Sequence, residues 1–63
     1  MYKHGEKVVN SQNSKPCTII GSQTEKYRTK EGTIMEEIEY CVQYEDGSTD
    51  WIPGEKTKKL LID

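Results

Sequence analysis

The chain has 63 residues, of which 9 are basic and 11 acidic, a formal net charge of -2 and a mean hydropathy of -0.91. Strong sequence-independent binding to nucleic acid depends on a surplus of Lys and Arg, so this charge balance argues against it. No apolar run approaches 18 residues and the first seven residues are polar, which predicts no transmembrane segment, no signal peptide and a cytoplasmic protein.

One domain, residues 1–63, is expected, because a chain this short buries only about 60% of the surface that its unfolded form exposes. Apolar side chains are few and Phe is absent. The expected core consists of Val8, Ile19, Ile34, Ile38, Tyr40, Val42, Trp51, Leu60 and Ile62. Such a core supports a small barrel or sandwich, without a deep substrate cavity.

A short strand is expected over residues 6–9, followed by a polar loop that Pro16 closes. The β-branched run from Cys17 to Ile20 begins the next strand. Gly21 interrupts that strand and predicts a bulge where a small sheet must curl. The strand continues to Arg28.

Residues 29–32 predict the turn of a long hairpin, and residues 33–45 form the returning strand. A helix over residues 33–40 is the rival interpretation, because apolar residues also fall at helical spacing and Thr33 with Glu36 resembles a capping box. The strand is favoured, since a helix would leave too few residues for the strand that leads into Asp46-Gly47.

Alternation of apolar and polar residues over 37–45 predicts a half-buried strand. Asp46-Gly47 favours a tight type I′ turn, and residues 49–52 return as a short strand that Pro53 ends. Residues 54–57 then predict a single 3₁₀ turn, and residues 58–62 a last strand beside the first. Five short strands in this order predict an all-β fold, a small five-stranded SH3-like barrel whose closure removes exposed edges.

No catalytic, metal or cofactor site is predicted, because His4 stands alone and neither cysteine has a positioned base. Cys17 and Cys41 are expected to be free thiols in a reducing compartment, with one disulfide as the alternative. The chain is therefore expected to be a non-enzymatic protein.

Several segments together resemble a Tudor-type SH3-like barrel, a layout that KOW-like barrels share: residues 5–8, 17–21, 40–47, 51–53 and Leu60. The hairpin Val42-Gln43-Tyr44-Glu45-Asp46-Gly47 is the strongest part of the likeness. The resemblance implies a cage for methylated lysine or arginine that includes Tyr44, Asp46 and Trp51. Asn10 and Lys15 stand where further aromatic residues would be needed, so such a cage would bind weakly.

The first functional hypothesis is a protein-binding module that docks through an aromatic and acidic hairpin face, formed by Tyr40, Tyr44, Glu45, Asp46 and Trp51. Its alternative is that Tyr40 and Trp51 are core partners across two strands, with Tyr44 the most exposed of the three. The hairpin also carries an acidic band: Glu36, Glu37, Glu39, Glu45, Asp46, Asp50 and Glu55. This band could attract a basic partner, or it could simply be a solvated face.

The second hypothesis is a KOW-like barrel associated with nucleic acid through Lys26, Tyr27, Arg28 and Lys30, with Tyr27 stacking on a base. A second basic patch comprises Lys56, Lys58 and Lys59. The third hypothesis is a structural protein that associates with itself through its long hairpin. If the chain acts alone, its size suggests a small bacterial or phage accessory protein.

Overall fold

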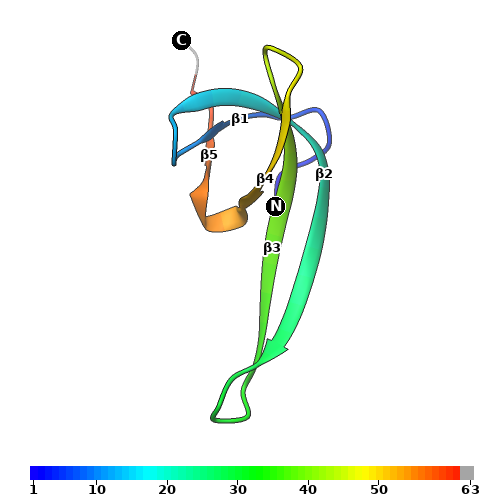
Figure 1. Ribbon diagram of the computed structural model, residues 1–63, viewed down its shortest axis with the longest axis vertical. Coiled ribbons are helices and arrows are strands. Elements are labelled where there is room, and N and C mark those ends of the chain that lie inside the picture. The colour runs from blue at the N-terminus through cyan, green and yellow to red at the C-terminus, as the bar shows by residue number, and fades with distance from the viewer. Residues whose placement is uncertain (62–63) are drawn as a thin grey trace.

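The computed structural model describes residues 1–61, which form an all-β protein with one five-stranded antiparallel sheet (Figure 1). The strands are β1 (Lys7–Asn10), β2 (Lys15–Arg28), β3 (Ile34–Tyr44), β4 (Thr49–Pro53) and β5 (Thr57–Lys59), with the 3₁₀ turn η1 (Gly54–Lys56) before β5. The sheet order is β4-β3-β2-β1-β5. The five strands, the 3₁₀ turn and the return of the last strand to the first are confirmed.

The rival helix over residues 33–40 does not form, because β3 pairs with β2 along its whole length from Ile34 to Tyr44. The described part of the chain contains no helix with the length and apolar character needed to cross a membrane. Ile62, which was expected in the last strand, lies outside the described residues.

The predicted bulge is present, since the pairing of β2 with β3 shifts between Ile19 and Gly21. Ile20 is the extra residue. Before the bulge, odd-numbered residues of β2 face the core, as the buried Cys17 and Ile19 show. After it, even-numbered residues do, because Ser22 pairs with the buried Tyr40. We call the core side of the sheet the inner face and the other side the outer face.

The β2–β3 hairpin and the β3–β4 hairpin each turn through three residues. The β3–β4 turn therefore differs from the predicted two-residue type I′ turn. The N–H of Gly47 donates to the Tyr44 carbonyl at 3.0 Å, and the N–H of Tyr44 donates to the Ser48 carbonyl at 2.8 Å. Only Gly47, with φ +91°, adopts the left-handed conformation there. This is a type I turn followed by a glycine bulge. Residues 29–33 repeat it, with Gly32 at φ +84°.

This turn decides which face Trp51 occupies. A two-residue turn at Asp46-Gly47 would place Trp51 opposite the buried Val42. The observed turn is one residue longer, so Trp51 pairs with Cys41 and Ile52 pairs with Tyr40. Because neighbouring residues of a strand point to opposite faces, the shift exchanges the two side chains. Ile52 is buried in the core and Trp51 is exposed on the outer face.

Within residues 1–61, six buried residues form the core: Val8, Cys17, Ile19, Tyr40, Val42 and Ile52. The predictions that Ile34 and Trp51 lie in the core are wrong, because Ile34 is 64% exposed and Trp51 is 48% exposed. Ile38 packs against the core from a half-buried position, and Leu60 is also half-buried. Ile34 is exposed because it lies near the far end of the β2–β3 hairpin, beyond the reach of any other strand of the described chain.

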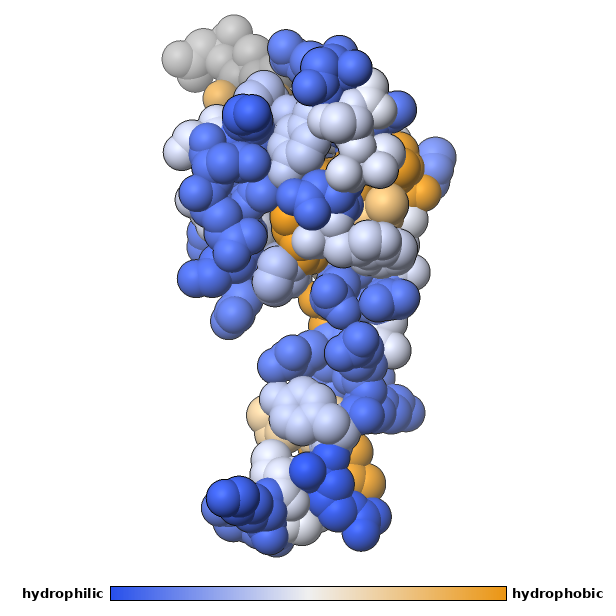
Figure 2. Space-filling model, in the orientation of Figure 1, coloured by the Kyte–Doolittle hydropathy of each residue, from blue (hydrophilic) through white to orange (hydrophobic). Residues whose placement is uncertain are grey.

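The whole molecule measures 43 × 22 × 20 Å, and the β2–β3 hairpin extends well past the other strands (Figure 1). We call residues 22–38 the arm and the remainder the head. Strand β4 pairs with β3 only as far as Glu39, and β1 pairs with β2 only over residues 15–18. The arm is therefore a two-stranded ribbon with two open edges, a unit that is marginally stable by itself in water. Its surface is mostly hydrophilic, with apolar side chains near the far end (Figure 2).

Gly54 fixes η1 against β3 at the junction of head and arm. A Cβ atom at this position would lie 2.6 Å from Ile38 Cγ2 and 3.1 Å from the Ile38 carbonyl oxygen. We expect Gly54→Ala to lower the free energy of unfolding by about 1–3 kcal/mol, the usual cost of overpacking. Urea denaturation followed by the fluorescence of Trp51, the sole tryptophan, measures it.

Gly21→Ala is the matched control, because a Cβ there would meet Cys41 Cβ at an ordinary 3.7 Å. We expect this variant to stay within about 0.5 kcal/mol of the wild type. Equal losses in the two variants would contradict the close packing of η1 on Ile38.

Candidate functional site

Tyr44, the residue expected to be most exposed, is held inside the head by its hydroxyl group. It is half-buried and packs against the core. The hydroxyl accepts hydrogen bonds from Asn10 Nδ2 at 3.0 Å and Asn13 Nδ2 at 3.3 Å, and donates to Asp50 Oδ2 at 3.1 Å. This network ties the β1–β2 loop to β4, so Tyr44 has a structural role.

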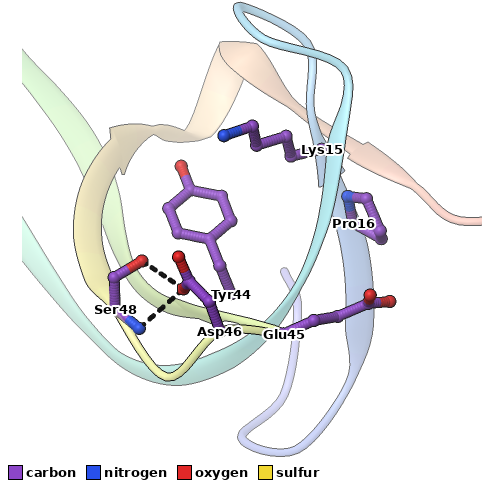
Figure 3. A pocket seen from close by; sticks show the side chains of 6 residues that line it. All are labelled: Lys15, Pro16, Tyr44, Glu45, Asp46 and Ser48. Carbon is purple, nitrogen blue, oxygen red and sulfur yellow. Dashed lines mark hydrogen bonds between the residues drawn. The ribbon is translucent and has the colours of Figure 1, made fainter.

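A cavity of about 280 Å³ lies beside Tyr44 and is lined by Lys15, Pro16, Glu45, Asp46 and Ser48 (Figure 3). The Asp46 carboxylate accepts hydrogen bonds from the hydroxyl and the N–H of Ser48, at 2.6 and 2.9 Å. These bonds lower the pKa of Asp46, and they stabilise the turn. Glu45 points away from the Tyr44 ring (Figure 3). Both acids line the cavity beside Tyr44, but Asp46 is engaged by Ser48 and Glu45 is turned away from the ring.

Tyr40 belongs to the core. It is 3% exposed, its ring meets Tyr2 edge to face with centroids 5.4 Å apart, and its hydroxyl accepts the Tyr2 N–H at 3.1 Å. Tyr40 and Tyr44 lie on the inner face, and Trp51 lies on the outer face. The structure therefore does not bring these three aromatics together on one face, and Tyr44 does not stand beside Trp51 as a methyl-lysine cage would need.

The outer face carries a continuous strip from the head to the end of the arm. Cross-strand pairing arranges it in four rows: Trp51–Cys41–Gly21, Pro53–Glu39–Gln23, Glu37–Glu25 and Met35–Tyr27. We call these residues the outer strip. Its ends are apolar and its middle is acidic. Glu25 and Glu37 stand directly opposite each other, an arrangement of like charges that destabilises a sheet.

The expected acidic band is thus divided between two faces. Glu37 and Glu39 of the band lie on the outer face, where Glu25 joins them, whereas Glu36 and Asp50 lie on the inner face. Sequence reasoning missed Glu25 and Cys41 as members of a shared surface with Trp51. The alternation of residues along β2 and β3 indicates which of them share a face. Assigning the residues of β2 to a face also requires the position of the bulge, because the alternation shifts by one residue there.

The basic candidates of the arm do not surround Tyr27. Lys26 and Arg28 lie on the inner face, opposite Glu36 and Ile34, and Lys30 is in the turn. Tyr27 lies on the outer face, and its hydroxyl donates to Glu37 Oε1 at 3.0 Å. This hydrogen bond raises the pKa of Tyr27. The structure therefore separates the aromatic ring from the cations that were to bind phosphate beside it.

The two cysteines are free thiols on opposite faces of the sheet. Cys17 is buried in the core, and burial raises the pKa of its thiol. Cys41 is half-buried in the outer strip, between Trp51 and Gly21. Within residues 1–61, no three His, Cys, Asp or Glu side chains are placed to hold a metal ion.

Comparison of the chain with protein-family models, with curated proteins and with solved structures finds no match.

We expect Tyr44→Phe to lower the free energy of unfolding by about 1–3 kcal/mol, because it leaves Asn10 Nδ2 without its acceptor. Asn10 is 2% exposed, so water cannot readily replace the lost partner. Tyr27→Phe is the control, since it removes one hydroxyl from an exposed hydrogen bond and should cost under about 0.5 kcal/mol. Thermal unfolding of both variants measures the difference. A neutral Tyr44→Phe would show that the network does not stabilise the head.

Proposed function

We propose that this protein is a non-catalytic protein-binding module built on a small SH3-like barrel, Tudor-like in its layout. The support for the barrel is the strand order β4-β3-β2-β1-β5, with a 3₁₀ turn before the strand that returns to β1. Core residues from the first four strands are almost fully buried, with Val8 and Val42 at 0% exposure, whereas one face of a flat single sheet would stay open to solvent. The bulge in β2 supplies the bend.

The observation that carries the binding proposal is the pairing of Glu25 with Glu37 on the strip that also exposes Trp51. The two carboxylates are opposite each other and a third, Glu39, occupies the next row. An isolated protein gains nothing from this repulsion. A partner that brings positive charge relieves it, so the preferred partner is a protein with a basic surface.

Trp51 is the apolar anchor of this surface. Its side chain is 48% exposed on a strand whose other face is fixed by the buried Ile52. Tryptophan is the residue over which an Arg or Lys cation stacks best, at about 0.5–2 kcal/mol per contact. The outer strip has acidic rows between apolar ends. A partner segment in which basic side chains alternate with apolar ones therefore complements it in both charge and hydrophobicity.

We place the protein in the cytoplasm, because both thiols are free and a reducing compartment keeps them so. The nucleic-acid hypothesis gains no support from the arm, since Tyr27 and the nearby cations are on different faces.

A titration with a synthetic peptide of alternating Arg and Val tests the proposal, with Trp51 fluorescence as the signal. We expect the peptide to change this fluorescence, and Glu25→Gln/Glu39→Gln to weaken binding about threefold to twentyfold, as the loss of two exposed ion pairs predicts. Calorimetry with Trp51→Ala, in which the signal is absent, should show at least a tenfold loss of affinity. That variant should remain folded, because Trp51 lies outside the core.

Glu31→Gln/Glu45→Gln is the matched control, since it removes the same charge from the two turns and not from the outer strip. We expect it to bind the peptide like the wild type. Equal weakening in both double variants would show only general attraction between opposite charges, and would sink the proposed surface.

A further inference from the structure

Of the strand edges that have no partner within residues 1–61, two have sequences that complement each other. The first is the edge of β3 over residues 34–37, beyond the end of β4. It reads Ile34-Met35-Glu36-Glu37. The second is the outer edge of β5 and the residues that follow it, Lys58-Lys59-Leu60-Leu61, since β5 pairs only with β1.

Both segments combine charge with exposed apolar surface. Ile34 and Met35 are 64% and 41% exposed, and Leu61 is 83% exposed. Glu36, Glu37, Lys58 and Lys59 are all exposed as well. In antiparallel register the two glutamates stand opposite the two lysines, and the apolar pairs follow in order. The segments therefore match both in charge and in hydrophobicity.

The match also respects the two faces of the sheet. Lys59 pairs with the buried Val8 and so lies on the inner face, whereas Lys58 lies on the outer face. Glu36 lies on the inner face and Glu37 on the outer face. Pairing Glu37 with Lys58 and Glu36 with Lys59 thus places each charge beside its opposite on the same face, as directly opposed residues require.

We propose that a second copy of this chain adds its β5 edge to the β3 edge of the arm, so that one sheet continues from molecule to molecule. Strand β5 is at one end of the sheet order and the open edge of β3 is on the β4 side, toward the other end. Placing them side by side keeps neighbouring strands antiparallel and all outer faces on one side. The added strand would give the arm the third strand that it lacks in a single copy.

The alternative pairings of two copies are unfavourable. Two arm edges together bring Glu36 and Glu37 against the same residues, and two β5 edges bring lysine against lysine. Like charges directly opposite destabilise a sheet, so of the three pairings between these two edges the mixed one is favoured. Because it joins two different surfaces, it closes into a ring or propagates as a filament. This inference does not depend on the proposed partner of the outer strip.

A charge exchange tests the pairing by light scattering during gel filtration. Wild-type protein should associate at low salt and dissociate as salt screens the charges. Glu36→Lys/Glu37→Lys and Lys58→Glu/Lys59→Glu should each be monomeric, with at least a tenfold weaker association. An equimolar mixture of the two variants should regain the wild-type mass, because each arm then meets an oppositely charged β5.

The control mixture carries the same charge changes away from both edges, namely Glu31→Lys/Glu45→Lys with Lys3→Glu/Lys15→Glu. Each control variant alone should associate like the wild type. Circular dichroism checks that every variant is folded. A wild-type protein that stays monomeric at millimolar concentration would overturn the proposal. So would single charge variants that associate like the wild type, or test variants that stay monomeric when mixed.

Discussion

The scarcity of apolar side chains is the constraint on which this structure depends. Six buried residues form the core, and all of them lie in the head. They can cover only the first part of the long β2–β3 hairpin, whose strands continue for seven and five residues as the arm. In a single folded molecule the arm therefore keeps two open strand edges and two solvated faces. The parts of the molecule available for recognition are the parts that the core cannot reach.

Alternation along the strands then gives the two faces different chemistry. The inner face holds the core and the Tyr44 hydrogen-bond network, and it continues along the arm with Lys26 and Arg28. The outer face holds Trp51 and three glutamates. A surface that is both acidic and aromatic thus arises on the side that does not stabilise the fold. This separation leaves Trp51 accessible on the surface, whereas Tyr40 and Tyr44 pack in the head.

The sequence was sufficient to predict the strands, the bulge near Gly21, the 3₁₀ turn and the pairing of the last strand with the first, because alternation and turn residues are local signals. It was not sufficient to predict which face of the sheet Trp51 occupies. Trp51 and Ile52 are adjacent apolar residues, and one residue in the length of the preceding turn decides which is buried. Asp46-Gly47 suits a two-residue turn as well as the observed three-residue turn, and a two-residue turn would place Trp51 on the core side of the sheet. Ile34 was misplaced for another reason, since its strand pattern continues past the point where any other strand of residues 1–61 covers it.

The most direct test of this account is amide hydrogen exchange, measured by nuclear magnetic resonance at a low and a high protein concentration. At low concentration, the amides of residues 22–28 and 34–37 should exchange much faster than those of Val8, Ile19 and Val42. At high concentration, protection should rise for residues 34–37 and 58–61, while residues 22–28 at the opposite edge of the arm should change less. Protection of the arm equal to that of the head in dilute solution would show that the arm is stable on its own. No gain at residues 34–37 on concentration would show that no second copy covers that edge.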